Sequence, residues 1–518
     1  MSACRSNIFE FGSSRALALA VTIAFPAFGC TLAQGGEVSV APADMQRIGT
    51  IDERFQSFNV EMVEVTGGTF WTPYAVRDAR QARPKARRPA MSGKADLLTK
   101  RSPIDLADAR LRRLASALAP AYLRVSGTWA NATFFVKSDK APLRPPAGYE
   151  GILTDRRWRE VIEFSRSIDA ALVISFAVSR GTRDKDGVWK PEQARQLVEA
   201  TRSAGGRIAA AEFMNEPDVG LIGGAPVRTD VAAYARNFGR FRSFLRQTAP
   251  DVMILGPGTT GRTSMDSELF LASAQDVDIV SYHFYGVLSE RCGGAHAADA
   301  ALSDEWLART DQTFAFYREL RDRALPGKPI WLTETAESAC GGNRWSSTFL
   351  DTFRYLDQLG RLARAGVQVV MHNTLAASDY GLLDETTHLP RPNYWGALLW
   401  RRLMGTVVLD PGVATQVGLH VYAHCQRSRS GGVALLVINN DPETSHALVV
   451  PNAAARYTLD AARLQDVAVR LNGIPLALDA ADRLPDLAGI PTSPGAVTFA
   501  PATITFLTIS DAGNRNCQ

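Results

Sequence analysis

A short apolar run that ends in polar residues decides the fold, and over residues 210–217 it reads AAEFMNEP. Seven further runs, rich in β-branched residues, occupy residues 58–66, 122–126, 171–177, 253–256, 279–284, 330–333 and 367–372. Stretches of helical periodicity separate them, at residues 106–118, 157–168, 192–204, 231–248, 305–324 and 347–365. Eight strands alternating with helices predict a (β/α)8 TIM barrel, because an open doubly wound sheet uses fewer strands.

The pattern changes after residue 404. Short strand-like runs with turn signals between them follow, at residues 407–409, 418–424, 433–439, 447–450, 457–459, 467–471 and 498–509. They predict a C-terminal antiparallel β-sandwich over residues 405–518, after a catalytic barrel over residues 51–404. Residues 34–50 are expected to pair with the sandwich before the chain enters the barrel.

The composition is that of an ordinary globular protein. Among 518 residues, 46% are hydrophobic and 21% are charged, which excludes a disordered, collagen-like or coiled-coil chain. The formal net charge of +4 is too small for this length to predict a nucleic-acid partner. No segment beyond the amino terminus is apolar enough to predict a membrane span.

The amino terminus has the pattern of a signal peptide. Arg5 and Arg15 flank the start of an apolar stretch over residues 16–28, which small residues follow. Cleavage after Ala33 would remove residues 1–33 and export the protein to the periplasm or the medium. A lipoprotein anchor at Cys30 is the weaker alternative, because Phe28 is bulky for such a site.

Four cysteines remain beyond the predicted signal peptide and allow three disulfide pairings. We favour Cys292–Cys340 and Cys425–Cys517, because each pair falls within one predicted region. Four unpaired thiols are the alternative. The chain contains no CxxC motif, so a structural zinc site is not expected.

Two glutamates follow predicted barrel strands, where the chemistry of such barrels is found. Glu216 lies after the fourth strand within Asn-Glu-Pro, and Glu334 lies after the seventh within Leu-Thr-Glu-Thr. A single glutamate at a strand end is most simply an ion pair at the barrel rim. Two carboxylates facing each other suit glycoside cleavage, in which one protonates the leaving oxygen and the other meets the oxocarbenium ion.

These residues resemble a known family. The motif Asn215-Glu216-Pro217 after strand four, with a glutamate after strand seven, is similar to the signature of the clan A retaining glycosidases. Within that clan the chain resembles glycoside hydrolase family 79, the heparanase and β-glucuronidase family. The stretches that carry the resemblance read PAYLRVSGT over residues 120–128, WLTET over 331–335, CGG over 340–342, DYGLLD over 379–384 and YW over 394–395.

The resemblance implies a role for each of five residues around the scissile bond. Glu216 would be the general acid/base, and Asn215 would hold the sugar 2-hydroxyl. Glu334 would be the nucleophile, Tyr285 would donate a hydrogen bond to it, and His283 would line the same wall. The family mechanism implies neither a metal nor another cofactor.

Further residues would hold the substrate. Backbone N–H groups of Gly341 and Gly342, with the Tyr380 hydroxyl, would bind the carboxylate of a glucuronic acid, since oriented amides stabilise an anion. Thr128 and Glu61 are further candidates for substrate contacts. The residues alone add that Glu212 points into the barrel as a buried, paired carboxylate, and that Glu337 is a loop residue outside the chemistry.

Two rival motifs carry less weight. Residues 256–261 read GPGTTG and match a dinucleotide-binding GxGxxG, but Pro257 occupies the turn and no clear helix opens at Gly261. A nicotinamide-dependent dehydrogenase is therefore disfavoured. His420 and His424 are spaced as metal ligands can be, yet without an obvious third ligand we interpret them as core or surface histidines.

A basic run follows the first predicted strand, on the face of the barrel where the carboxylates lie. It is either a contact surface for a sulfated polyanion or a solvated loop. The first possibility favours endo action on heparan sulfate, as in heparanase. An exo-β-glucuronidase that releases terminal glucuronate is a second candidate function, and a non-catalytic carbohydrate-binding protein is a third. The basic residues are Arg77, Arg80, Arg83, Lys85, Arg87, Arg88, Lys94, Lys100 and Arg101.

Overall fold

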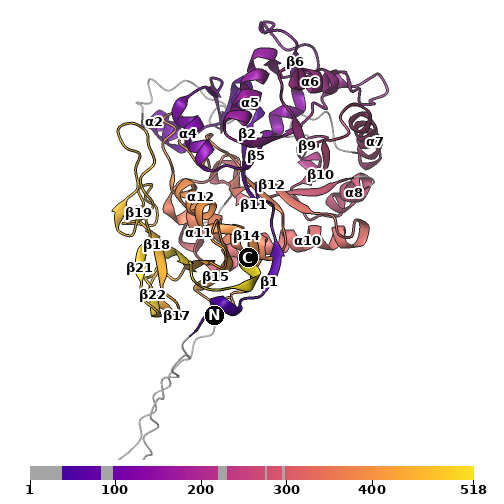
Figure 1. Ribbon diagram of the computed structural model, residues 1–518. Coiled ribbons are helices and arrows are strands. Elements are labelled where there is room, and N and C mark those ends of the chain that lie inside the picture. The colour runs from indigo at the N-terminus through magenta and orange to yellow at the C-terminus, as the bar shows by residue number, and fades with distance from the viewer. Residues whose placement is uncertain (1–37, 83–96, 220–229, 275–276, 295–297) are drawn as a thin grey trace, which may run out of the picture. The chain divides into compact units, whose positions relative to one another are not determined.

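The computed structural model describes residues 38–82, 97–219, 230–274, 277–294 and 298–518 (Figure 1). The predicted signal peptide, including Cys30 as the alternative lipid-modified residue, lies outside the described residues. The same holds for residues 83–96 in the middle of the basic run.

Eight parallel strands close into a barrel, as predicted, in the order in which they occur along the chain (Figure 1). Each strand is followed by at least one helix on the outside, so the carboxyl ends of all eight strands open on one face. The strands are β2 (Gln56–Glu61), β5 (Ala121–Ser126), β8 (Ala170–Ser175), β9 (Ile208–Glu212), β10 (Met253–Thr259), β11 (Ile279–Leu288), β12 (Ile330–Ala339) and β13 (Val369–His372).

Side chains cap the first turn of several of the surrounding helices. The side chains of Asp108, Thr154, Asp230 and Thr263 accept hydrogen bonds from backbone N–H groups of the first turn. The helices are α4 (Ala109–Ala117), α5 (Asp155–Ser167), α6 (Glu192–Ser203), α7 (Val231–Thr248), α8 (Ser264–Ser273), α9 (Asp304–Leu307), α10 (Arg309–Ala324), α11 (Phe349–Arg364) and α12 (Pro392–Leu403).

Three sequence expectations are wrong in detail. The first predicted strand ends early, because Glu61 and Glu64 form a capping box that starts helix α1 (Met62–Thr66). A helix does open after the GPGTTG stretch, three residues beyond Gly261, where Thr263 caps α8; the stretch itself belongs to barrel strand β10 and its following loop. Glu337 lies within strand β12 rather than in a loop.

The barrel interior has an apolar layer at the start of its strands. This cluster comes from β5 and from β8 to β13, and it fills the barrel as a packed core. Charged and polar side chains follow it along the same strands, among them Arg124 on β5 and Glu212 on β9, both about 1% exposed. The polar groups therefore gather at the carboxyl ends. The residues of the apolar cluster are Tyr122, Val173, Ala210, Leu255, Ile279, Trp331, Val369 and Met371.

Short sheets in the loops lie on the same face. They are β3 (Gly68–Trp71) with β4 (Leu98–Arg101), and β6 (Thr133–Val136) with β7 (Gly151–Thr154). Helix α2 (Tyr74–Gln81) lies between β3 and β4 along the chain.

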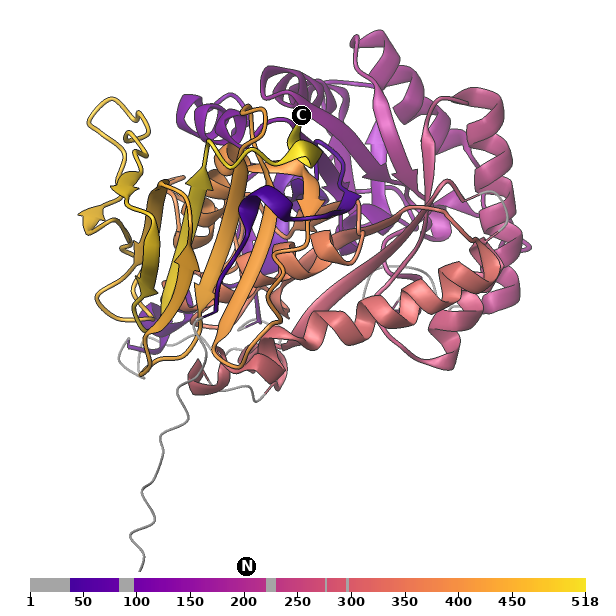
Figure 2. The same cartoon turned by 60° about the horizontal axis from the view of Figure 1, so that its bottom comes forward.

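A C-terminal antiparallel sheet follows the barrel, as predicted (Figure 2). Residues on one side of its central strand, such as Leu436, belong to the core shared with the barrel helices. Residues on the other side, such as Leu435, pack with a separate two-stranded sheet in a second core. The large sheet comprises β1 (Arg47–Thr50), β14 (Met404–Leu409), β15 (Leu419–Gln426), β16 (Val433–Asn439), β23 (Thr503–Ile509), β18 (Ala454–Asp460), β19 (Arg470–Leu471), β20 (Ile474–Pro475) and β21 (Ile490–Thr492); the small sheet comprises β17 (His446–Val450) and β22 (Gly495–Phe499).

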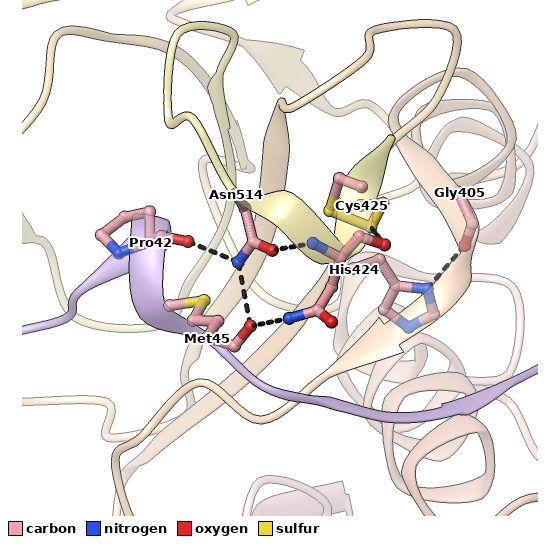
Figure 3. Close-up of a disulfide and its surroundings, with 8 residues drawn as sticks. Pro42, Met45, Gly405, His424, Cys425 and Asn514 are labelled. Carbon is pink, nitrogen blue, oxygen red and sulfur yellow. Dashed lines mark hydrogen bonds between the residues drawn. A yellow bond between two sulfur atoms is a disulfide. The ribbon is translucent and has the colours of Figure 1, made fainter.

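The two ends of the described chain meet at this sheet. Asn514 Nδ2 donates hydrogen bonds to the carbonyl oxygens of Pro42 and Met45, at 2.7 and 2.9 Å (Figure 3). The disulfide Cys425–Cys517 lies beside them, and a second disulfide joins Cys292 to Cys340. The favoured cysteine pairing is thus confirmed, and such bonds are typical of proteins that fold in an oxidising compartment. No helix among the described residues is both long and apolar enough to cross a membrane.

His420 joins the sheet to the barrel helices. Its two ring nitrogens lie 2.6 Å from Asp357 on α11 and 2.7 Å from Asp304 on α9. Arg361 and the Tyr422 hydroxyl bind the same Asp357 carboxylate. Although burial lowers the pKa of His420, the neighbouring carboxylates outweigh it and raise that pKa.

His424, four residues along the same strand, is also buried but stays neutral. Its Nδ1 bonds the Gly405 carbonyl oxygen at 2.7 Å, and burial lowers its pKa to about 4 (Figure 3). Both histidines are therefore core residues, as interpreted from the sequence.

The two histidines should give opposite pH dependences of stability. A histidine whose pKa is raised in the folded state stabilises the fold at pH values below its unfolded-state pKa, and this stabilisation is lost as the pH rises through the folded-state pKa. His420→Gln should therefore lower the free energy of unfolding by about 3 kcal/mol near pH 6 and by less near pH 9. A histidine whose pKa is lowered in the folded state stabilises the fold at pH values above its unfolded-state pKa. The loss of unfolding free energy caused by His424→Gln should therefore shrink as the pH falls from about 6.5 toward 4. Urea unfolding of both variants and the wild type at several pH values measures these losses. If the loss changed with pH in the same direction in both variants, the opposite pKa shifts of the two histidines would be contradicted.

Candidate active site

A buried arginine on β5 lies at the centre of the polar groups. Arg124 donates two hydrogen bonds to Glu212 Oε2, at 2.8 and 3.0 Å, and one to Glu334 Oε2 at 2.8 Å. It also donates to Asn215 Oδ1 at 2.8 Å and lies 3.2 Å from His283 Nε2. One cation thus contacts groups from β9, the segment that follows it, β11 and β12. Glu212 is buried and paired, as expected.

Sequence reasoning did not single out Arg124. It lies within the quoted stretch over residues 120–128, as a charged residue in the middle of an otherwise apolar strand. Such a residue is almost never buried unless it is paired, which is the signal that could have identified it.

The structure brings Glu216 and Glu334 together across the mouth of the barrel. His283 lies beneath both, with Nδ1 3.0 Å from Glu216 Oε1 and 3.8 Å from Glu334 Oε2. One carboxylate oxygen of each glutamate and a His283 nitrogen all lie within 4.8 Å of one another. Glu216 has a backbone φ of +47°, a left-handed conformation that few residues other than glycine adopt.

The two carboxyls have pKa values shifted in opposite directions. Burial and the negative charge of Glu334 raise the pKa of Glu216 to about 7. Burial also disfavours an ionised Glu334, but the positive charges of His283 and Arg124 outweigh it and lower that pKa. The Tyr285 hydroxyl, which donates to Glu334 Oε1 at 2.6 Å, acts in the same direction. Near neutral pH one carboxyl can hold a proton while the other is ionised.

Asn373 is a second residue that the sequence did not reveal. Its amide nitrogen lies 3.1 Å from Glu61 Oε1, 3.0 Å from the Tyr285 hydroxyl and 3.3 Å from the Tyr380 hydroxyl. Glu61 is buried, and burial together with the charge of Glu334 raises its pKa well above the ordinary value. Asn373 follows β13, and its side chain links three predicted substrate-binding residues.

A pocket with a volume of about 360 Å³ opens above these groups. Six predicted site residues line it: Glu61, Thr128, Glu216, Tyr285, Glu334 and Tyr380. None of its described lining residues is a Lys or an Arg. The other lining residues are Trp71, Trp129, Val219, Thr260, Val287, Leu288, Ala339, Cys340 and Asn373.

The four remaining predicted residues adjoin the pocket lining without being part of it. Asn215 and His283 are fully buried beside Arg124. Gly341 and Gly342 are buried against the lining residues Trp71 and Tyr380; a Cβ at Gly341 would come within 2.5 Å of the Trp71 Cβ. All ten predicted site residues therefore lie in or directly around one site.

Part of the basic run can be placed. Arg80 donates to Thr99 Oγ1 at 2.7 Å, and Arg101 lies 4.0 Å from Glu64 and 3.9 Å from Glu385. These two cations are already engaged by neighbouring side chains.

Glu216, His283 and Glu334 are spaced closely enough to hold a metal ion. A cation there would face the Arg124 guanidinium, which already donates to Glu334 and lies beside His283. The donor set therefore favours an acid/base pair over a metal centre.

Comparison with known proteins identifies the family. The model described as "Glycosyl hydrolase family 79, N-terminal domain" matches residues 101–360. The chain belongs to glycoside hydrolase family 79. Among its relatives, Heparanase-like protein 1 of Arabidopsis thaliana is 29% identical over 67% of each chain. Heparanase of Mus musculus is 27% identical over 77% of this chain and 84% of the relative.

One further relative and one solved structure extend the comparison. Baicalin-beta-D-glucuronidase of Scutellaria baicalensis is 27% identical over 64% of this chain and 67% of the relative. A solved 4-O-alpha-L-rhamnosyl-beta-D-glucuronidase from Fusarium oxysporum has a TM-score of 0.62 at 13% identity, covering 91% of this chain and 99% of that one. The structural likeness supports the barrel and the C-terminal sheet.

The raised pKa of Glu216 should depend on Glu334. In Glu334→Gln the negative charge is lost, so the Glu216 carboxyl should titrate below the wild-type value of about 7. A carbon-13 NMR titration with labelled glutamate measures this, and the signal that disappears in Glu216→Gln provides its assignment. Replacing the exposed Glu163 by glutamine should leave the titration unchanged, whereas an unchanged value in Glu334→Gln would contradict the coupling.

Proposed function

We propose that this family 79 glycosidase is a retaining β-glucuronidase. The observation that carries the proposal is the pair Glu216 and Glu334, whose pKa values are shifted apart beneath a pocket large enough for a sugar. A glycosidase needs one protonated and one ionised carboxyl across the scissile bond. The close approach of their oxygens fits a retaining enzyme, because an inverting pair must leave room for a water.

The reaction proceeds by two displacements. Glu334 attacks the anomeric carbon and forms a glycosyl ester, while Glu216 gives its proton to the departing oxygen. Glu216 then takes a proton from water, whose oxygen attacks the same carbon and releases Glu334 as a carboxylate. Tyr285 and Arg124 hold Glu334 ionised and oriented before the first step.

The carboxylate of the sugar would bind to backbone N–H groups. Within the described residues, neither the Gly341 nor the Gly342 N–H donates a hydrogen bond. Buried N–H groups are rarely left without an acceptor, so a substrate carboxylate is a fitting partner. The Tyr380 hydroxyl on the pocket wall would be a third donor, while Thr128, Glu61 and Asn215 would contact the sugar hydroxyls.

Replacing either carboxylate should remove most of the activity. Glu334→Gln should show no hydrolysis of 4-nitrophenyl β-D-glucuronide above background, and Glu216→Gln should lower kcat by about 10²–10⁴-fold. Proton NMR during wild-type turnover should show β-glucuronate as the first product. Glu163→Gln is the control for a glutamate away from the pocket. First appearance of the α-anomer would contradict retention, and binding without turnover would favour a carbohydrate-binding protein.

The mode of action has two candidates. Endo action on heparan sulfate, predicted from the basic run, is supported by the similarity to animal heparanases. The lining of the pocket favours the second candidate, release of terminal glucuronate from small glucuronides. The lining includes the apolar residues Val219, Val287 and Leu288, and none of its described residues is a Lys or Arg that could pair with sulfates.

Product analysis separates the two modes. Incubated with heparan sulfate, an exo-enzyme should release free glucuronate without shortening the chains on a sizing column. An endo-enzyme should shorten the chains, and raised salt should then weaken polymer binding if the basic run contributes. The Glu334→Gln variant is the control for both assays. The two disulfides and the heparanase relatives support an exported enzyme, periplasmic or secreted.

A further inference from the structure

The proposed mechanism does not use one buried acid near the pocket. Glu337 lies three residues beyond Glu334 on β12 and is fully buried. Its Oε1 accepts three hydrogen bonds, from Ser338 Oγ at 2.7 Å, the Asn343 N–H at 2.6 Å and Ser346 Oγ at 2.6 Å. One carboxylate oxygen therefore ties the end of the strand to residues further along the chain.

The loop between these donors carries Gly341 and Gly342, and the carbonyl groups at its start have partners. The Cys340 carbonyl oxygen accepts from Ser289 Oγ at 3.2 Å, and the Gly341 carbonyl oxygen accepts from the Asp379 N–H and Ser378 Oγ, both at 3.0 Å. In a planar trans peptide the N–H points away from the C=O. The N–H groups of both glycines are thus directed away from these partners.

The next peptide unit is held at both ends. Arg291 Nη2 donates to the Gly342 carbonyl oxygen at 3.1 Å, and the N–H of the same peptide, which belongs to Asn343, donates to Glu337. Arg291 is itself fixed by an ion pair with Asp379. Cys340, at the start of the loop, is held by its disulfide to Cys292.

We propose that Glu337 is a positioning residue that holds the N–H groups of Gly341 and Gly342 in place for the carboxylate of the substrate. This inference rests on the proposed β-glucuronidase function. Glu337 does not line the pocket, so it acts through the loop. Three donors converge on one oxygen, an arrangement that a carboxylate satisfies and an apolar residue leaves unpaired.

The same three hydrogen bonds favour the ionised form of Glu337. Burial and the charge of Asp351 raise its pKa to about 7, while the hydrogen bonds from Ser346, Asn343 and Ser338 lower it. These bonds are the contacts that the loop loses when the carboxyl is removed.

The test compares two non-hydrolysable ligands that differ only at the sugar carboxyl. They are phenyl β-D-1-thioglucuronide and its uncharged carboxamide, measured as competitive inhibitors of 4-nitrophenyl β-D-glucuronide hydrolysis. The wild type should bind the acid more tightly than the amide. In Glu337→Ala the inhibition constant of the acid should rise about tenfold, corresponding to one lost charge-assisted hydrogen bond, while that of the amide changes little.

Two variants keep the test informative. Glu337→Gln retains an acceptor oxygen at the same place and should preserve most of the preference for the acid, even if Glu337→Ala folds poorly. Asp357→Asn changes another fully buried acid, which is bonded by His420 and Tyr422 and does not bond the loop, and should leave the preference unchanged.

Each remaining outcome has one meaning. An equal rise of both inhibition constants in Glu337→Ala, or no rise, would overturn the positioning role. If the wild type hydrolyses the glucuronide but binds acid and amide equally, the loop does not recognise the carboxylate, and the inference fails while glucuronidase activity stands. If the wild type hydrolyses no glucuronide, the proposed function itself fails.

Discussion

The pairing of Arg124 with Glu212 and Glu334 is the interaction on which the candidate site depends. Removing a cation and two carboxylates from water costs several kcal/mol for each ion, and only close, well-directed hydrogen bonds offset this cost. Arg124 makes such bonds to both carboxylates and to Asn215. The same bonds connect β5 to β9 and β12, so the site and the barrel interior are held by one set of contacts.

The direction of the strands explains why these groups meet. All eight barrel strands run parallel, so residues near their carboxyl ends converge on one face although they are distant in sequence. The apolar layer at the other end packs the barrel and leaves the polar groups near the pocket. Glu334 thereby lies in a low-dielectric environment with cations on one side and Tyr285 on another, which is the condition for keeping a buried carboxyl ionised.

Contacts outside the barrel strands hold the loops above the barrel. The small sheets β3–β4 and β6–β7, the Cys292–Cys340 disulfide and the ion pair of Arg291 with Asp379 all lie in segments that follow barrel strands. On α11, Asp357 bonds His420 and so joins the C-terminal sheet to the helix layer. The sheet therefore supports the helices that surround the barrel.

Much of the fold could be predicted from the sequence, because strands buried on both faces read as continuous apolar runs and helices as periodic ones. Predicted and observed strands agree least at their ends, where the capping box of Glu61 and Glu64 stops β2 and where β12 continues through Glu337. Those ends depend on local hydrogen bonds that hydrophobic periodicity does not report. The predicted site residues are found together, but Arg124 and Asn373 were missed, because their partners are remote in sequence.

The sequence by itself determined the alternation of strands and helices and the motifs that place the chain in its family, whereas it favoured one cysteine pairing without deciding it. Only the tertiary structure decided which ionisable groups lie close enough to shift each other's pKa values. The pKa values of Glu216 and Glu334 depend on burial and on charges from other strands, and these distances exist only once the barrel closes. Electrostatic interactions between side chains vary with distance and solvent exposure, and neither quantity is encoded in the spacing of residues along a chain.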